Sequence, residues 1–130
     1  MLSQPTQDAM TFFEGYSRDF DNCDWPAFTS LLYEPFVTVR GDGSVHLLQS
    51  RADARRFFEN VSSGWRQEGY ERCVTSKFEV MMLGRWSRLV TFDWDLLRKD
   101  RTVLRRWRQS YQLISIQQEW KVLGSTFHSG

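Results

Sequence analysis

Side chains that could take part in acid–base chemistry cluster between residues 93 and 108. Asp93 and Asp95 precede a charged segment, and Arg106 and Arg108 follow it. A carboxylate placed against a substrate can act as a general acid or base, and an adjacent guanidinium can hold an anion. Each of these residues alternates with an aromatic one, so a strand would carry charges on one face and rings on the other. The chemistry therefore depends on which face is turned inward.

This alternation predicts a β-hairpin whose register follows from its tip. A turn centred on residues 100–101 sets one aromatic pair and two pairs of opposite charge, namely Trp94–Trp107, Asp95–Arg106 and Asp93–Arg108. Directly opposed side chains stabilise a sheet by roughly 0.2–1 kcal/mol for each pair. We expect an inner, mainly aromatic face that consists of Val90, Phe92, Trp94, Trp107 and Tyr111. The four charged residues would then lie on the outer face, unless a bulge reverses one strand.

Arg40 and Asp42 form another polar pair, at the end of a short predicted strand. An arginine there could hold a carboxylate through two parallel hydrogen bonds. In the alternative, Asp42 only helps the adjacent glycines to form a turn. Tyr16 also has two interpretations. It is either a core tyrosine whose hydroxyl meets a carbonyl group, or a hydrogen-bond donor to an oxygen of a bound ligand.

The cysteines and histidines give no sign of a metal or cofactor site. Cys23 and Cys73 lack the spacing of metal ligands, and we expect two buried or half-buried free thiols. His46 falls on a short edge strand and His128 close to the C-terminus, so both are expected to be exposed. The sequence therefore predicts no metal and no cofactor, and it suggests no cysteine–histidine pair for nucleophilic catalysis.

The elements that must position these residues follow from apolar periodicity and from caps. Three helices are predicted: one at residues 6–22, a short one that Asp24 caps and Pro35 ends, and one from Ser50 to about Ser63. The short strands 36–40 and 45–48, joined by a glycine turn, lie between the second and third helices. Long strands follow at 72–83, in the hairpin, and at 119–127, and a loop carrying Trp65 precedes the first of them.

The composition limits what the whole chain can do. Its 130 residues suit one domain, residues 1–130, and 15% are aromatic residues that can fill a core or line a pocket. A net charge of +1 provides no field for nucleic acid or an anionic membrane, despite a basic hairpin tip. No apolar run approaches the roughly 20 residues of a spanning helix. We expect a cytoplasmic protein that binds neither membranes nor nucleic acid.

Several short segments together resemble the nuclear transport factor 2-like (NTF2-like) superfamily, which includes polyketide cyclase-like proteins and ketosteroid isomerase. The resemblance is carried by Tyr16 with residues 22–32, by residues 50–58, and by residues 110–113 and 119–122. It implies an α+β fold in which a strongly bent antiparallel sheet wraps over about three N-terminal helices and forms a cone with a pocket. It also implies a homodimer through the outer sheet face.

The resemblance argues against one reaction of the superfamily. It places Tyr16 at the position of the catalytic tyrosine of ketosteroid isomerase. The base of that enzyme falls at or near Arg40, which cannot accept a proton, and its protonated acid falls near Ser110. Two of the three groups are therefore missing, and isomerase chemistry of that kind is not expected.

Two functions stay open on the sequence. In the first, the cone binds a small apolar or aromatic molecule, with an anionic group as an option, and an isomerase- or cyclase-like reaction could follow. Its candidate pocket residues are Tyr16, Arg40, Phe92, Trp94, Trp107 and Tyr111. In the second, the chain is a non-catalytic dimerisation or interaction domain whose cavity is filled by its own aromatic side chains. A cavity of about 300 Å3 or more would support the first function, and a closed, packed cone the second.

Overall fold

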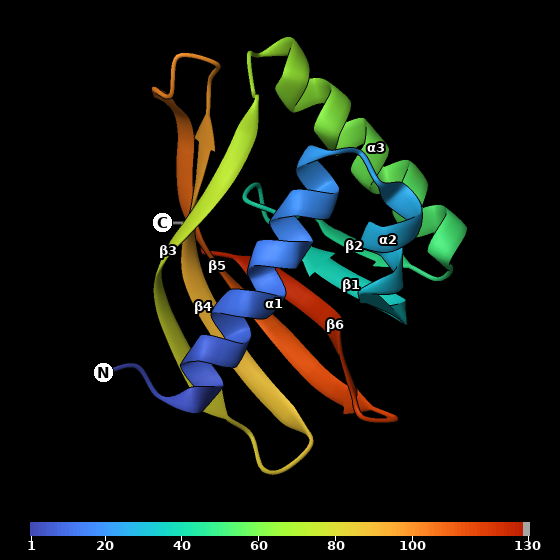
Figure 1. Ribbon diagram of the computed structural model, residues 1–130. Helices are drawn as coiled ribbons and strands as arrows, with labels where there is room; N and C mark the ends of the chain where they lie inside the picture. Colours follow the sequence, from blue (N-terminus) through green and yellow to red (C-terminus); the bar gives the residue numbers. More distant parts are fainter. Residues whose placement is uncertain (129–130) are drawn as a thin grey trace.

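The chain folds into helices that lie against one curved sheet, over the residues that the structure describes, 1–128. In this computed structural model the elements are α1 (Gln4–Asp21), α2 (Trp25–Ser30), β1 (Leu32–Val39), β2 (Val45–Leu48), α3 (Arg51–Gln67), β3 (Arg72–Met82), β4 (Ser87–Leu97), β5 (Val103–Ile116) and β6 (Glu119–Phe127). Figure 1 shows α1 lying across the sheet, with α2 and α3 beside it. The α+β cone expected from the sequence is confirmed.

The six strands form one mixed sheet in the order β2-β1-β6-β5-β4-β3. All neighbouring strands are antiparallel except β1 and β6, which run parallel. Parallel neighbours need a long crossover connection. Here the connection from β1 to β6 consists of β2, α3, β3, β4 and β5. The parallel pair is the one departure from the antiparallel sheet expected, and it brings the ends of β1 and β6 together.

One apolar face of α1 holds the helix against the sheet. Phe13, Tyr16 and Phe20 recur at three- and four-residue spacing and are all buried. The ring of Phe13 lies 4.7 Å, between centroids, from both Phe92 on β4 and Tyr111 on β5. Burial of such large rings is the main favourable term in folding. These contacts therefore fix the helix over the concave side of the sheet, which forms the wall of the cone.

The β4–β5 hairpin has the register predicted from its tip. The structure pairs the same residues, Trp94–Trp107, Asp95–Arg106 and Asp93–Arg108. A bulge between Leu96 and Leu97 takes up the extra residue of the tip, so that it does not disturb the pairs below it. The aromatic side chains of this hairpin accordingly face α1, and Phe92, Trp94 and Tyr111 are at most 4% exposed.

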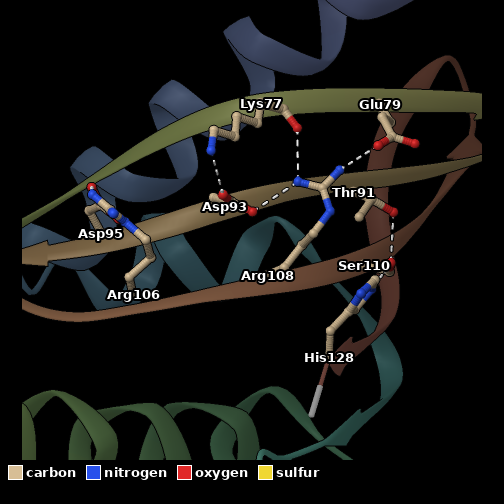
Figure 2. Close-up of polar contacts among 9 residues, drawn as sticks. All are labelled: Lys77, Glu79, Thr91, Asp93, Asp95, Arg106, Arg108, Ser110 and His128. Carbon is tan, nitrogen blue, oxygen red and sulfur yellow. Dashed lines mark hydrogen bonds and ion pairs between the residues drawn. The ribbon is translucent and has the colours of Figure 1, made fainter. Parts of the chain in front are cut away.

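Ion pairs cover the outer face of the hairpin and of the neighbouring strand β3 (Figure 2). Arg106 donates to both carboxylate oxygens of Asp95, at 2.6 and 2.8 Å, and these bonds lower the pKa of Asp95. Arg108 donates to Asp93 at 2.9 Å and to Glu79 on β3 at 2.8 Å. Pairs of this kind at a surface contribute about 0–1 kcal/mol each. The charged residues thus support the register and do not face the cone.

The second helix is shorter than expected. Asp24 caps it, as predicted, and Pro26 lies in its first turn, but it ends at Ser30 and not near Pro35. Leu32, which the predicted helix would have included, is buried in β1, where it pairs with Val122 of β6. Pairing with a strand distant in sequence outweighs the local helical spacing, which is a weak determinant by itself.

The third helix is longer than expected. Ser50 caps it by accepting a hydrogen bond from the backbone N–H of Asp53 at 3.1 Å, as predicted. The helix does not end near Ser63 but continues to Gln67, so that Trp65 lies on the helix and not in a loop. The Trp65 ring packs 5.7 Å from the ring of Phe20 on α1. This contact explains why the helix continues through Gly64, since packing outweighs the cost of about 1 kcal/mol for a helical glycine.

Candidate functional site

An aromatic cavity lies inside the cone, between α1, α3, the end of β1 and strands β3, β4, β5 and β6. The buried rings of Tyr16, Trp94 and Tyr111 form its inner wall. Three half-buried rings form its open side, which we call the mouth cluster, and these are Trp65, Trp107 and Phe127. Trp107 stacks on Phe127 with ring centroids 5.1 Å apart, and Trp65 lies 5.5 Å from Trp107. The cavity is therefore aromatic from its floor to its rim.

Five of the six candidate pocket residues line this cavity, namely Tyr16, Arg40, Trp94, Trp107 and Tyr111. The sixth, Phe92, lies behind the wall. Its ring stacks between Tyr111, at 5.3 Å, and Phe78 of β3, at 4.6 Å, and it has no exposed surface. Phe92 follows the same inward alternation as Trp94, but α1 covers it at a level of the cone where no space is left.

Arg40 extends from the end of β1 into the cavity. Its Nη1 donates to the hydroxyl of Thr38 at 3.2 Å. Its guanidinium carbon lies 4.4 Å from the centroid of the Phe127 ring, which is a cation–π distance. Burial lowers the pKa of Arg40 from its usual value, but an arginine stays charged in a protein. The cavity therefore contains a positive charge.

Asp42 does not accompany Arg40 into the cavity. Its carboxylate accepts from the backbone N–H of Ser44 at 2.9 Å and from the hydroxyl of Ser44 at 2.7 Å. These bonds lower the pKa of Asp42 and close the turn between β1 and β2. Of the two interpretations of this aspartate, the geometry supports the turn.

The two tyrosines of the cavity are hydrogen-bond donors and not bases. Burial raises the pKa of both Tyr16 and Tyr111 above the usual tyrosine value, so that both hydroxyls stay protonated. The indole N–H of Trp94 donates to the Tyr111 oxygen at 2.8 Å. A ligand oxygen at this depth would accordingly meet donors, which stabilise negative charge but cannot accept a proton at neutral pH.

The residues that could act as bases lie elsewhere. The described lining contains no carboxylate and no imidazole. Asp93 and Asp95 are on the outer face, and so is Ser110, which contacts His128 at 2.7 Å (Figure 2). His46 is half-buried and hydrogen-bonds Ser44 at 3.0 Å, where exposure was expected, because it packs on the ring of Phe57.

A polar cluster lies behind the cavity where α1 ends. The carboxylate of Asp21 accepts from the Tyr70 hydroxyl, from the thiol of Cys73 at 3.1 Å and from the Cys73 backbone N–H at 3.3 Å. Burial raises the pKa of the Cys73 thiol well above its usual value, with the charge of Asp21 acting in the same direction. Cys73 lines the cavity as a neutral thiol, which is a poor nucleophile.

Both cysteines are free. Cys73 is half-buried, as expected, but Cys23 is exposed, which corrects the expectation of two buried or half-buried thiols. The reason is local, because Cys23 lies in the turn after α1 with a φ of 56°, outside the apolar stripe of the helix. Among residues 1–128, no group of three or more histidine, cysteine, aspartate and glutamate residues is placed to hold a metal ion.

The space that a water-sized molecule can enter in the cavity is about 40 Å3. A single water needs roughly 10–15 Å3 measured in this way, so that about three waters fit. The value is far below the roughly 300 Å3 of a site that encloses a drug-sized ligand. The cone is largely filled by its own rings, and only a small group can enter without displacing them.

The sequence did not single out several of the lining residues, which are Phe20, Phe58, Cys73, Leu96, Gln109, Ser125 and Phe127. For Gln109 the signal was present, because it shares the inward alternation of Trp107 and Tyr111 on β5. Ser125 and Phe127 alternate in the same way on β6, but no local pattern shows that β6 lies beside β1. Their place in the site depends on that pairing.

Solved structures with the same fold come from several bacteria. Aln2 from a Streptomyces species is 12% identical over 98% of this chain and 94% of its own, with a TM-score of 0.77. A candidate dehydratase of the NTF2-like family from Streptomyces avermitilis is 12% identical over 95% and 94%, with a TM-score of 0.73. A candidate aromatic ring hydroxylase from Novosphingobium aromaticivorans is 17% identical over 95% and 87%, with a TM-score of 0.70. At these identities the likeness concerns the fold.

The remaining comparisons define the family. No curated protein matches the chain significantly. No helix within residues 1–128 combines the length and apolar character needed to cross a bilayer. Residues 7–130 match the family described as NTF2-like protein (DUF6841). The chain therefore belongs to this NTF2-like family.

Proposed function

We propose that the domain binds a small apolar or aromatic molecule at the mouth of the cone. The observation that carries the proposal is the mouth cluster, in which three half-buried rings from α3, β5 and β6 border a cavity that is open to solvent. Rings that serve only the core are covered, as Phe13 and Phe92 are. Aromatic faces at the rim of a concave site provide stacking area for a flat ligand.

The proposal is binding and not acid–base turnover. An isomerase- or cyclase-like reaction needs a group that accepts a proton from the substrate. The described cavity wall offers hydroxyl, amide, thiol and guanidinium donors but no carboxylate or imidazole. The neighbours described as a candidate dehydratase and a candidate hydroxylase share the fold, and a shared fold does not transfer their chemistry.

Trp107→Ala tests the mouth cluster. Loss of a stacking partner at the rim is expected to weaken binding of 2-naphthamide, a flat neutral probe, by roughly tenfold, which corresponds to about 1.4 kcal/mol. Titration calorimetry with the folded variant measures the loss, and circular dichroism checks the fold. The matched control is Trp120→Ala, because Trp120 is also half-buried, lies near the β5–β6 turn and does not line the cavity. Equal losses in both variants would contradict binding at the mouth.

A homodimer through the outer sheet face is a second part of the proposal. It is supported by four large apolar side chains that are exposed near the β3–β4 turn, which are Met81, Met82, Leu83 and Trp86. Met81 shares the outer face with Glu79, two residues before it on β3, and exposed apolar side chains at one edge of a sheet favour association with another protein surface. The dimer is also compatible with the alternative function, a non-catalytic interaction domain. In that case the largely filled cone would serve mainly as a rigid support for the interface.

Light scattering at micromolar concentration tests the dimer. The expected mass is twice the 15.5 kDa of one chain, and Met81→Glu is expected to shift the mass toward that of the monomer because it places a charge in an apolar contact. Lys99→Glu, in the exposed β4–β5 tip at the end of the sheet opposite this apolar surface (Figure 1), is the control and should leave the mass unchanged. A monomer mass for the unmodified chain would refute the dimer.

A further inference from the structure

Within the described part of the protein Arg40 has no ion-pair partner, although Asp42 of the adjacent turn attracts its charge from a greater distance. Arg40 is the one charged side chain of the cavity lining among the described residues. No carboxylate of residues 1–128 lies within 4.0 Å of its guanidinium nitrogens. Its side-chain hydrogen bond within that part of the chain goes to Thr38, whereas a guanidinium has five N–H donors. A partly buried charge without a counterion is costly, and rings of Phe57 and Phe127 offset only part of this cost.

A chain of hydrogen bonds holds the guanidinium in place. Thr38, which accepts from Arg40, is 2.9 Å from the hydroxyl of Ser125 on β6. Ser125 accepts from Gln109 at 3.0 Å, and Gln109 accepts from the indole N–H of Trp107 at 2.9 Å. Thr38 and Gln109 are at most 3% exposed. The arginine is therefore linked through buried polar groups to the mouth cluster, which makes its position reproducible for a ligand.

The size of the cavity matches the group that such an arginine recognises. About three waters fit in the cavity that Arg40 lines, which is close to the volume of a carboxylate group and too small for an aromatic ring. A planar carboxylate can accept two parallel hydrogen bonds from a guanidinium. The ring attached to it would stay outside, against the half-exposed mouth cluster.

We propose that Arg40 binds the carboxylate of a small monoanionic aromatic acid whose ring stacks on the mouth cluster. This inference rests on the binding function proposed above and names the class of its ligand. In this proposal Arg40 selects ligands that carry a negative charge. The rings of Trp65, Trp107 and Phe127 recognise the flat apolar part of the ligand. The hydroxyls of Tyr16 and Tyr111 stay as further donors on the inner wall.

The test compares 2-naphthoate with 2-naphthamide, which has the same ring and no charge, by titration calorimetry at neutral pH and low ionic strength. The unmodified chain is expected to bind the naphthoate about tenfold to a hundredfold more tightly, as charge-assisted hydrogen bonds require. Arg40→Met should abolish this preference, so that the variant binds the two probes with affinities that agree within about threefold. Arg40→Lys keeps the charge but loses the planar guanidinium that can donate two parallel hydrogen bonds, and it should retain only part of the preference.

Arg106→Met is the matched control, since Arg106 pairs with Asp95 on the outer face and should leave the preference intact. If the unmodified chain binds both probes equally, the role of Arg40 is refuted while binding at the mouth stands. If neither probe binds, both proposals are refuted. If either substitution of Arg40 prevents folding, the probe pair on the unmodified chain, with the Arg106 control, still decides the charge preference.

Discussion

Phe13→Ala is expected to lower the free energy of unfolding by about 3–5 kcal/mol, which is the usual cost of truncating a fully buried phenylalanine. Phe13 has no exposed surface. Its ring lies within 5.3 Å of the rings of Phe92, Tyr111 and Tyr16, between centroids, so that its loss leaves a cavity between α1 and the sheet. A domain of this size has a total stability of roughly 5–15 kcal/mol, so the substitution removes a large share of it. Urea denaturation at one fixed protein concentration measures the change.

The neighbouring residue Phe12 provides the control for Phe13→Ala, because Phe12→Ala makes the same substitution on the same helix. Phe12 is half-buried at the edge of the core. Phe12→Ala is expected to cost clearly less than Phe13→Ala, because part of its surface stays in water in the folded state. Equal costs for the two variants would mean that the face of α1 described here is not the one that packs against β4 and β5.

Gly124→Ala is expected to destabilise the protein by about 1–3 kcal/mol through overpacking, although only one methyl group is added. Gly124 lies on β6 and pairs with Val37 across the parallel β1–β6 contact. A β-carbon there would be 2.8 Å from the carbonyl oxygen of Val37 and 3.0 Å from its Cγ1. The first neighbour is backbone and cannot rotate away, so the two strands would have to separate. Thermal or urea unfolding measures the loss.

At Gly64 the same substitution, glycine to alanine, is expected to change stability in the opposite direction. It lies inside α3, and a β-carbon at this place would have no neighbour within 4 Å. Gly64→Ala is therefore expected to stabilise the protein by about 0.5–1 kcal/mol, since alanine loses less backbone entropy in a helix. A neutral result for Gly124→Ala beside a stabilised Gly64→Ala would show that β1 and β6 are not in close contact.

The site that these elements build differs in one respect from the pocket expected. Its small volume agrees with a cone filled by its own rings, as the interaction-domain hypothesis requires. That hypothesis does not explain the open side of the cavity or the presence of Arg40 in it without an ion-pair partner among the described residues. Both observations are explained if only the carboxylate of the ligand enters the cone. The carboxylate would occupy the small cavity, and the ring would stay at the rim.

How much of the site could be predicted depends on the range of the interactions involved. Trp94, Trp107 and Tyr111 were placed on one face by alternation within a single hairpin, and local alternation is decided by the geometry of the strand. Phe92 obeys the same rule but misses the cavity. The rule assigns a face and says nothing about where along that face α1 leaves space.

The sequence by itself determined the α+β class, the register and the two faces of the β4–β5 hairpin, and the caps of α2 and α3. Each of these depends on residues close together in the chain, whose spacing carries the information. Only the tertiary structure decided that Arg40 lies near Ser125 and the mouth cluster. That juxtaposition depends on the parallel pairing of β1 with β6, in which Thr38 meets Ser125 across 87 positions of sequence. No local periodicity encodes such a contact, because the collapse of the whole sheet around α1 selects it.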